Sequence, residues 1–409
     1  MGDATPVGFK TLFMVNQAAG PLNRELLEDL AARGVRATVL AGWVDVRPGV
    51  APPFEIIYGK PLVKAPVWRR LWTWGVFTLQ AFRHLVKHRR EPVFVTTNPP
   101  WVMLGLPCLR WLLGVRYVLL MYDIYPDVAE RMGHAKPGGL VGRIWRALSR
   151  RAMCRAEGVI TLGSHMADTL RGHLHQGDVC PIEVIPNWAD TDAIRPLDKA
   201  DNPFAREHGL VGKLVVTYSG SFGATHDTES IVEVASRLGD LPDVHVMLIG
   251  GGTREREVAQ LVADRNVANL TLLPFQPADV LPYSLAASDC AIVCLDEGYE
   301  GVSVPSKTYS ALAAGAALLA VSGPDTELTD LVAERGCGIA IPPRSPDAME
   351  AAIRRLHADR DLLARCREAA RRAAVEEFSR PVGTARTIAY LAACFGAAET
   401  PSAGPADGR

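Results

Sequence analysis

The chain has 409 residues, of which 48% are hydrophobic and 22% are charged, so its composition is that of a globular protein. This length exceeds one ordinary hydrophobic core and predicts about two domains. The formal net charge of -1 argues against nucleic-acid binding, which requires a positive surface. The eight cysteines include no Cys-x-x-Cys pair, and the first residues show no leader pattern, so we expect buried reduced thiols and a cytoplasmic location.

Short apolar runs alternate with amphipathic segments of helix length. The runs are KTLFMVN, RATVLAGW, PVFVTTN, VRYVLLMYD, GVITLGS and IEVIPN, followed by KLVVTYSG, VHVMLIGGG, LTLLPF, CAIVCLDE and ALLAVSG. Apolar strands that alternate with helices predict parallel sheets with both faces covered, so the fold class is α/β. A polar stretch over residues 188–212 divides the runs into two sets. We therefore expect two Rossmann-like domains that face each other across a cleft, with ligands at the carboxyl ends of the strands.

The division of the runs predicts the domain boundaries. We place an amino-terminal Rossmann-like domain at residues 1–197 and a carboxyl-terminal one at residues 198–380. Residues 381–396 are expected to form a helix that packs back on the first domain. Residues 397–409 are rich in small residues and contain too little apolar area to order themselves, which predicts a disordered tail.

The stretch WVMLGLPCLRWLLGVRYVLLM, residues 101–121, is long enough to suggest a membrane span. Pro107, Arg110 and Arg116 interrupt it, and charged residues are costly inside a bilayer. We predict a helix that ends at Gly114 and a buried strand over residues 115–121.

Two glycine-rich turns follow strands in the second half. The first is predicted at residues 220–223 and the second at residues 250–252, each followed by a helix. Glycine lets the backbone approach a ligand closely, and the N–H groups at a helix start favour phosphate. Neither turn matches the Gly-x-Gly-x-x-Gly pattern of NAD sites. The candidate donor-binding residues here are Gly220, Ser221, Gly223, Gly250, Gly251 and Arg254.

A third strand end carries the sequence EGYEGVSVPSKTYSALAAG, residues 297–315. Pro305 suits the first helical position and Gly315 the carboxyl-terminal cap. Lys307 then lies in the first helical turn, where the macrodipole disfavours a cation unless an anion is present, and this predicts phosphate binding. The segment is not a nucleotide-hydrolysing P-loop, because Ser306 replaces the second glycine and Pro305 lacks an N–H donor.

The order of motifs resembles the family 4 glycosyltransferases of the GT-B class, in particular enzymes of bacterial cell-surface polysaccharide synthesis such as exopolysaccharide or O-antigen. The matching segments are TTNPP, MYDIYPDVAERMG, VITLGSHMADTL, VIPNWAD, YSGSFGATHD, LIGGGTRERE, LLPFQPADVLPYSLAASDCAIVCL and GVSVPSKTYSALAAG. The resemblance implies a UDP- or GDP-linked sugar donor held by the second domain and an acceptor held by the first. It also implies catalysis without a metal or other cofactor, because helix starts and a cation stabilise the departing diphosphate.

One feature of the family is missing. Family 4 commonly has two glutamates in an E-x7-E pattern, whereas Val302 and Ser310 stand at these positions and Glu297 and Glu300 are out of register. We associate a Pro-Ser-Lys loop with a subgroup of the same polysaccharide enzymes. Lys307 is then expected to carry more of the diphosphate charge. The remaining donor-binding candidates are Ser303 and Ser306 beside the anion, Glu300 as a sugar contact, and Phe275 and Gln276 near the base.

The first half supplies the candidate acceptor residues. Asp123, in MYDIYPD, follows a buried strand and could orient an acceptor hydroxyl or take its proton, so Asp123 and Lys307 are the catalytic candidates. Asp123 could instead cap the helix that follows. Asn98 and Tyr125 are assigned with it to acceptor binding. The weaker candidates Asn187 and His134 could equally satisfy local backbone groups, as could Asn98.

Two segments of the first half combine tryptophan with cations and are predicted contacts to an anionic membrane surface. Residues 67–90 are predicted to form a helix with Trp68, Trp72, Trp74, Phe77 and Phe82 on one face and cations on the other. The alternative is a helix with one core face and one solvated basic face. Residues 139–158 add five arginines beside a tryptophan. Together they favour peripheral attachment to the inner face of the cell membrane.

The leading functional hypothesis is transfer of a hexosyl or related sugar from a nucleotide donor to a polyprenyl-linked saccharide, with retention of configuration. Nucleotide-sugar 2-epimerases share the fold and are the first alternative. The second is a nucleotide-binding module that has lost activity together with the glutamate pair.

Overall fold

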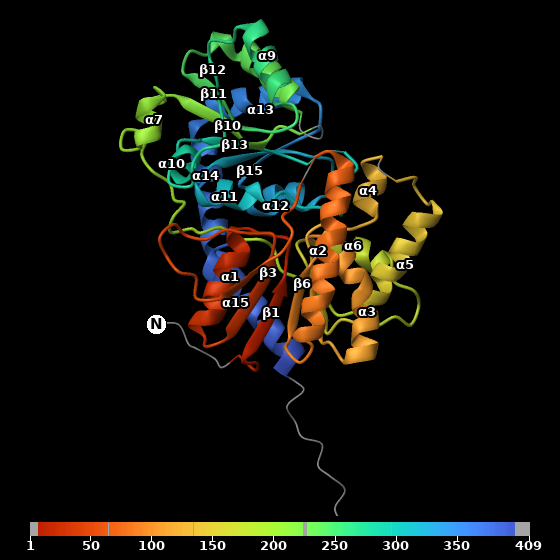
Figure 1. Ribbon diagram of the computed structural model, residues 1–409. Helices are drawn as coiled ribbons and strands as arrows, with labels where there is room; N and C mark the ends of the chain where they lie inside the picture. The colour runs from red at the N-terminus through yellow and green to blue at the C-terminus, as the bar shows by residue number, and fades with distance from the viewer. Residues whose placement is uncertain (1–6, 64, 134, 224–226, 296, 397–409) are drawn as a thin grey trace, which may run out of the picture. The chain divides into compact units, whose positions relative to one another are not determined.

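The computed structural model describes residues 7–63, 65–133, 135–223, 227–295 and 297–396 (Figure 1). His134 and the predicted tail over residues 397–409 lie outside these ranges. The chain divides into two compact units. Among the described residues, unit 1 comprises 7–162, 169–185 and 384–396, and unit 2 comprises 163–168 and 186–383. The chain therefore enters unit 2 at residue 163, returns to unit 1 at residue 169 and enters unit 2 again at residue 186. This last crossing lies before the predicted domain boundary at residue 197.

Unit 1 is built on a seven-stranded parallel sheet with the order β5-β3-β1-β6-β7-β8-β9. Its elements are β1 (Thr11–Val15), β2 (Ala18–Ala19), α1 (Pro21–Ala32), β3 (Arg36–Ala41), β4 (Trp43–Val44), β5 (Glu55–Tyr58), α2 (Val67–Lys87), β6 (Val93–Thr96), α3 (Trp101–Leu113), β7 (Tyr117–Met121), α4 (Asp127–Arg131), α5 (Leu140–Cys154), β8 (Gly158–Thr161) and β9 (Ile182–Val184). The central strands β6, β7 and β8 are buried along their whole length, as expected for strands covered on both faces.

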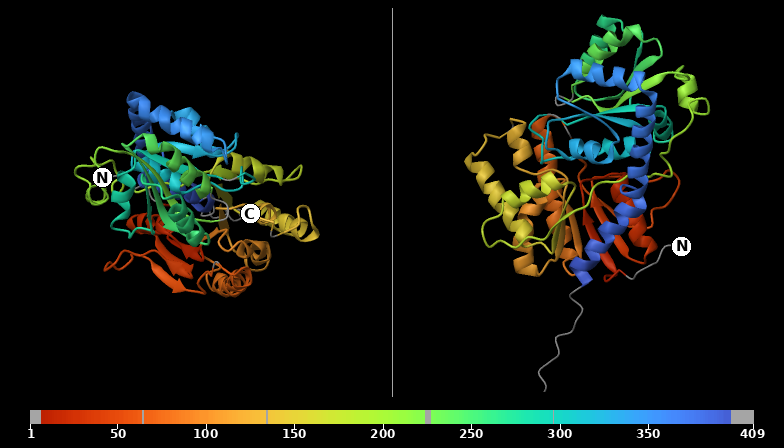
Figure 2. Two further views of the ribbon diagram at one scale, coloured as in Figure 1. Left: turned by 90° about the horizontal axis from the view of Figure 1, so that it is seen from above. Right: turned by 180° about the vertical axis from the view of Figure 1, so that it is seen from behind.

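Two helices run across the division of the chain into units. They are α6 (Ser164–Gly172) and α15 (Arg380–Gly396). From residue 384 onward α15 belongs to unit 1, and the view from behind shows it alongside the strands of that unit (Figure 2). The Phe395 ring packs edge-on against Phe9, and the Arg116 guanidinium donates to the Cys394 carbonyl at 3.0 Å. Residues 384–396 thus belong to the amino-terminal unit.

Unit 2 is built on a six-stranded parallel sheet with the order β12-β11-β10-β13-β14-β15. Its elements are α7 (Pro203–Glu207), β10 (Leu214–Ser221), α8 (Thr228–Arg237), the 3-10 helix η1 (Leu238–Asp240), β11 (Val244–Gly251), α9 (Glu255–Arg265), β12 (Leu270–Leu273), α10 (Leu281–Ala286), β13 (Cys290–Cys294), α11 (Lys307–Ala313), β14 (Ala317–Val321), α12 (Glu327–Arg335), β15 (Gly338–Ile341), α13 (Pro346–Ala358) and α14 (Arg360–Glu376). The strand order reverses direction between β10 and β13, which is where open α/β sheets bind ligands.

Several sequence predictions need correction at their boundaries. Each predicted apolar run contains a strand, but the runs did not identify β2, β4, β5 or β15. Strands β2 and β4 are only two residues long, and most side chains of β5 and β15 are not fully buried. Gly220 and Ser221 belong to β10 rather than to a turn, because they pair with Gly250 and Gly251 of β11. The predicted helix over residues 101–113 is confirmed, and Gly114 ends it in the left-handed region at φ 70°.

The predicted separation of aromatic and cationic faces on α2 is wrong. Trp74 and Phe77 are buried in unit 1, whereas Trp68 and Trp72 are exposed. The helix therefore has two apolar faces. In α5, Arg146 forms ion pairs with Asp127 and Glu130, so part of the predicted positive charge of this segment is neutralised.

Within the described ranges no helix is both long and apolar enough to cross a membrane. The cysteines in these ranges form no disulfide bond, and their environments differ. Cys290, Cys294, Cys337 and Cys366 are buried, Cys154, Cys180 and Cys394 are partly buried, and Cys108 is exposed.

Candidate donor-binding site

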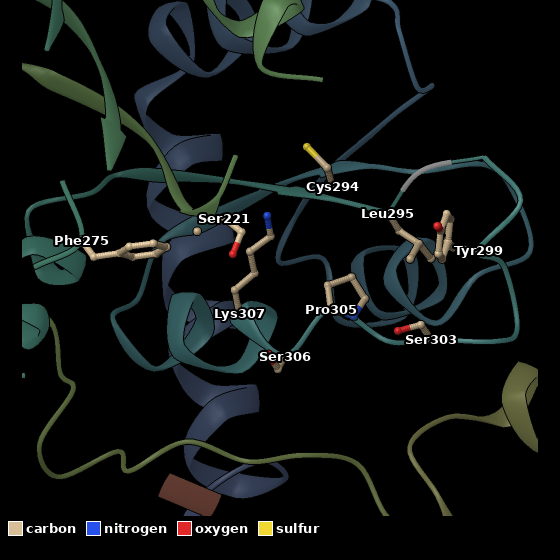
Figure 3. A pocket seen from close by; sticks show the side chains of 10 residues that line it. Ser221, Phe275, Cys294, Leu295, Tyr299, Ser303, Pro305, Ser306 and Lys307 are labelled. Carbon is tan, nitrogen blue, oxygen red and sulfur yellow. The ribbon is translucent and has the colours of Figure 1, made fainter. Parts of the chain in front are cut away.

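A cavity of about 410 Å³ lies in unit 2 at the carboxyl ends of β10 and β13 (Figure 3). It is lined by Gly220, Ser221, Phe275, Cys294, Leu295, Tyr299, Ser303, Pro305, Ser306 and Lys307. Small-molecule sites typically measure about 300 to 1,000 Å³, so the cavity is large enough for such a ligand. The topological switch point of the sheet and the cavity therefore coincide.

Lys307 is the cation of this cavity. Its side chain extends from the first turn of α11 toward Ser221 (Figure 3). The ammonium nitrogen is buried and lies 4.0 Å from the ring centroid of Tyr218, which is a cation–π contact. The Tyr218 hydroxyl in turn donates to the Ser221 carbonyl at 2.8 Å. Tyr218 thus connects the position of the lysine to the end of β10.

Glycine is required where β10 and β11 approach each other. A Cβ atom at Gly250 would lie 1.8 Å from the Gly220 carbonyl oxygen, which no side chain could tolerate. Gly250 also has a φ of 157°, a conformation that L-residues rarely adopt. A Cβ at Gly251 would lie 3.5 Å from the ring of Phe275. Gly250 therefore allows the ends of β10 and β11 to pack closely, and Phe275 lies beside Gly251 at the cavity.

The structure brings together six of the residues predicted from the second half to bind the donor. Those that line the cavity are Gly220, Ser221, Phe275, Ser303, Ser306 and Lys307. Gly250 and Gly251 lie behind them in β11, and Gly223 does not line the cavity.

Three predicted donor contacts have other partners. Arg254 forms ion pairs with Glu229 and Glu257, which hold its guanidinium on the surface of unit 2. The Gln276 amide donates to the Pro274 carbonyl at 2.8 Å, and the Glu300 carboxylate accepts from the Gly298 N–H at 2.7 Å. None of the three side chains lines the cavity.

Sequence reasoning missed four lining residues. Cys294 is the last residue of β13 and Leu295 follows it, and Tyr299 and Pro305 lie in the loop that leads to α11. Their position after a strand was the available signal, but the prediction concentrated on glycines, charges and hydroxyls. Apolar side chains form much of the wall, as in most ligand pockets.

Helix α11 begins at Lys307 rather than at Pro305, with Ser306 as its N-cap. The Thr308 hydroxyl donates to the Pro305 carbonyl at 2.7 Å, so Pro305 forms the turn that precedes the helix. Gly315 follows the carboxyl-terminal cap with φ 69°, which confirms its predicted role at this end.

The two positions of the missing glutamate pair contribute no carboxylate to the cavity. Val302 is completely buried, and the Ser310 hydroxyl donates to the Lys307 carbonyl at 3.0 Å. Neither residue lines the cavity. Lys307 is therefore the charged side chain among the lining residues.

In unit 1, the predicted acceptor residues follow β6 and β7. The Thr97 hydroxyl oxygen accepts from the backbone N–H groups of Tyr122 at 3.0 Å and Asp123 at 3.4 Å, and the Asn98 carbonyl accepts from the Gln17 N–H at 2.7 Å. Asp123 is not the N-cap of the following helix, because Pro126 holds that position in α4. Thr97 thus fixes the backbone on which Asp123 is presented.

Tyr125 belongs to a group of aromatic side chains from three helices and a loop. Its ring stacks on Trp145 with a centroid distance of 5.6 Å and meets Trp74 edge-on at 5.9 Å, while Trp74 meets Trp101 edge-on. These contacts provide a packing role for Tyr125 besides the predicted contact to an acceptor. Asn187, a weaker candidate, is buried and lies in unit 2.

Sequence reasoning also missed a buried polar chain at the end of β1. The Asn16 amide donates to the Asn23 side-chain oxygen, and the Asn23 amide donates to the Tyr122 hydroxyl at 2.9 Å. Burial raises the pKa of Tyr122 to about 12, even though its hydrogen bond with Asn23 acts in the opposite direction. The chain links the first strand and α1 to the residue before Asp123.

Family comparisons agree with this architecture. The description "Glycosyltransferase Family 4" matches residues 22–193, and "Glycosyl transferases group 1" matches residues 202–373. The probable glycosyltransferase WbjE of Pseudomonas aeruginosa is 30% identical over 275 residues, which cover 66% of this chain and 68% of WbjE. The chain belongs to the family 4 glycosyltransferases. The fold of this family 4 glycosyltransferase is α/β of the GT-B class, with two Rossmann-like units.

Two further proteins are similar along most of the family 4 chain. The putative colanic acid biosynthesis glycosyl transferase WcaI of Escherichia coli K12 is 28% identical, and the alignment covers 82% of this chain and 87% of WcaI. The crystal structure of HepE from Anabaena in complex with UDP matches with a TM-score of 0.70 and 14% identity, over 94% of this chain and 100% of HepE. At this identity the likeness to HepE shows the fold alone. The named relatives support a glycosyltransferase of polysaccharide biosynthesis.

Proposed function

We propose that this family 4 glycosyltransferase moves a hexosyl or related sugar from a UDP- or GDP-linked donor to a polyprenyl-diphosphate-linked saccharide in cell-surface polysaccharide assembly. The observation that carries the proposal is the cavity of unit 2, which Lys307 lines together with Ser221, Ser303 and Ser306 at the strand ends. A cavity lined by a lysine and by serines is suited to a diphosphate.

Lys307 has the chemistry that the leaving group needs. When the bond between the sugar and the donor phosphate breaks, negative charge grows on the diphosphate. A lysine held beside the cavity by its contact with Tyr218 supplies a positive charge that stabilises the diphosphate. We therefore propose metal-independent catalysis. The fold shared with HepE, which was crystallised with UDP, supports a nucleotide-diphosphate donor.

We assign acceptor binding to unit 1, with Asp123, Asn98 and Tyr125 as the proposed contacts. Asp123 follows β7 on a backbone held by Thr97, so its carboxylate has a defined place from which to orient an acceptor hydroxyl. Retention of configuration follows from the family assignment and is part of the proposal. So is peripheral attachment to the inner face of the cell membrane, where a polyprenyl-linked acceptor would be found.

The absence of carboxylates at Val302 and Ser310 gives weight to a second candidate, a nucleotide-binding module without transferase activity. The cavity does not depend on these two positions, since neither lines it. Donor binding is therefore compatible with both candidates, and only measurement of transfer separates them.

The test is incubation of the full chain with radiolabelled UDP- or GDP-sugars and a bacterial membrane lipid extract. Transfer predicts label in the organic-soluble fraction, and the signal should persist in EDTA. Epimerised nucleotide sugar without labelled lipid would overturn the proposal in favour of an epimerase. UDP or GDP could instead stabilise the chain thermally while no lipid becomes labelled, even in extracts in which a known transferase is active. That result would identify a nucleotide-binding module without transferase activity.

A further inference from the structure

The buried polar chain of unit 1 has a direction that is fixed from one end. The Ala18 N–H donates to the Asn16 side-chain oxygen at 3.1 Å, so the Asn16 amide group faces the other way and donates to the Asn23 side-chain oxygen. The Asn23 amide group then donates to the Tyr122 hydroxyl oxygen at 2.9 Å. A backbone N–H can only donate, and Asn16 and Asn23 are both buried, so the direction of each bond is determined. The Tyr122 oxygen therefore accepts a hydrogen bond.

The proton of the Tyr122 hydroxyl is not used by this chain. Within the described ranges, the bond from Asn23 is the one hydrogen bond that this hydroxyl forms, so its proton has no acceptor there. Tyr117 differs, because its hydroxyl donates to the Ala152 carbonyl at 2.8 Å. Burial raises the pKa of Tyr122 to about 12, so the oxygen keeps its proton at neutral pH. Tyr122 is therefore a hydrogen-bond donor that lacks an acceptor within the described protein.

This donor lies where the sheet of unit 1 is expected to bind a ligand. The strand order reverses direction between β1 and β6, and open α/β sheets bind ligands beside such a reversal, at the carboxyl ends of the strands. Asn23 lies in the first turn of α1, and Tyr122 directly follows β7, so the bond between them spans the end of β6. A Cβ atom at Gly20, the N-cap of α1, would have no neighbouring segment within 4 Å. The start of α1 therefore borders open space.

We infer that the Tyr122 hydroxyl binds the terminal sugar of the acceptor by donating its proton to a sugar oxygen other than the one that reacts. The inference rests on the proposed function, in which unit 1 holds a saccharide. A neutral donor suits the hydroxyl and ring oxygens of a sugar, and it leaves the reacting hydroxyl to Asp123, the next residue. Water accepts the same proton in the free enzyme, and the sugar displaces it. Asn16 and Asn23 are positioning residues that act through Tyr122.

The first experiment compares two tyrosines of unit 1. Tyr122→Phe removes the hydroxyl and keeps the ring, and the matched control Tyr117→Phe removes a hydroxyl that donates within the protein. Transfer of labelled sugar at several concentrations of bacterial lipid extract gives the acceptor KM and kcat, and calorimetry with UDP gives donor affinity. In Tyr122→Phe the acceptor KM should rise roughly three- to tenfold, with a smaller change in kcat and none in UDP affinity. Tyr117→Phe should lower thermal stability and leave the acceptor KM unchanged.

A second variant tests the direction of the chain. In Asn23→Asp the introduced carboxylate keeps the shape of the amide but only accepts hydrogen bonds, so it takes the Tyr122 proton away from the sugar. The assays are made at about pH 8, well above the ordinary pKa of an aspartate. The acceptor KM should rise as in Tyr122→Phe, and the combination of both substitutions should add little, because each removes the same donor. Thermal unfolding shows that each variant is folded.

An unchanged acceptor KM in Tyr122→Phe would overturn the inference, and so would equal rises in Tyr122→Phe and Tyr117→Phe. Losses that add fully in the double variant, or a parallel loss of UDP affinity, would also contradict it. Failure of the proposed function looks different, because the unaltered chain would then label no lipid.

In that case, saccharides released from the same extract by mild acid are titrated and followed by ligand-observed NMR. Weaker binding to Tyr122→Phe than to Tyr117→Phe would support the inference without transfer. Absence of binding to the unaltered chain would overturn the inference together with the proposed function.

Discussion

The two units use the carboxyl ends of their parallel strands differently. In unit 2, the strand ends are formed by glycines and small residues, and a cavity of about 410 Å³ remains between them. In unit 1, the corresponding positions are occupied by side chains that bond or pack with each other, such as Asn23 with Tyr122 and Tyr125 with Trp145. The comparison teaches that parallel topology supplies the location of a site, whereas the residues after each strand determine how much of that location side chains fill.

The helical surfaces differ as well. In unit 2, arginines on α8 and α13 pair with carboxylates, as in Arg237 with Asp347 at 2.5 Å and Arg354 with Asp240 at 2.8 Å. Helices α2, α3 and α5 of unit 1 contain no carboxylate of their own. Cations of these helices that form ion pairs find their carboxylates in neighbouring segments, as Arg146 does in Asp127 and Glu130.

The largest expected effect concerns the cation in the cavity of unit 2. Lys307→Ala removes the charge that opposes the growing charge on the diphosphate, so kcat/KM should fall about 10²- to 10³-fold. Steady-state transfer assays and thermal shifts with UDP and GDP measure the loss. Arg256→Ala, an exposed cation on α9, is the control and should retain activity. Normal kinetics in Lys307→Ala would show that the cavity does not hold the reacting diphosphate.

The next effect tests whether unit 1 contributes chemistry. Asp123→Asn keeps the shape of the side chain but removes its charge and basicity, so kcat should fall by about 10²-fold. Donor affinity, measured by titration calorimetry with UDP, should stay unchanged because the proposed donor site lies in unit 2. Equal losses in turnover and donor affinity would assign Asp123 a structural role instead.

A smaller effect is expected at Tyr218, which we regard as a positioning residue for Lys307. Tyr218→Leu removes both the ring under the ammonium and the hydroxyl bond to the Ser221 carbonyl, and UDP affinity should fall about tenfold. Tyr218→Phe keeps the ring and should lose only a few-fold in affinity. Equal UDP affinities of the two variants would mean that the Tyr218 ring does not contribute to donor binding. The measurement is a titration with UDP, made after each variant is shown to be folded.

The smallest effect concerns stability of unit 1. Burial acts to raise the pKa of Asp127, but hydrogen bonds and charges from His173 and Arg146 outweigh it, so the pKa lies below its ordinary value. A carboxyl group with a lowered native pKa stabilises the fold at neutral pH, and this contribution disappears as the pH falls through the native pKa. Asp127→Asn should therefore cost about 1 to 2 kcal/mol in free energy of unfolding at pH 7.

Chemical denaturation between pH 7 and pH 3 checks this expectation. The stability difference between the unaltered chain and Asp127→Asn should shrink as the pH falls below about 4, where the unfolded carboxyl also becomes protonated. A difference that does not change with pH would mean that the amide disturbs packing rather than charge.

Much of this molecule is determined locally in the sequence. Apolar runs bounded by glycine and polar residues identified strands β1, β3, β6 to β14 and their alternation with helices, because a strand buried on both faces must be apolar throughout. The order of strand-end motifs identified the family, and glycine at positions 220 and 250, together with Lys307, marked the region of the cavity. The apolar runs and the strand-end motifs are defined by residues that are adjacent in the chain, so the sequence alone reveals them.

Tertiary structure decided which side chains share a surface. Only the folded chain places the Tyr218 ring against the Lys307 ammonium and Phe275 beside Gly251. Likewise, only the folded chain pairs Arg254 with Glu229 and Glu257. It also determines that the aromatic residues of α2 separate onto opposite faces, one buried and one exposed. Such contacts join residues far apart along the chain, and their choice depends on how strands and helices pack, which residue types and spacing alone do not specify.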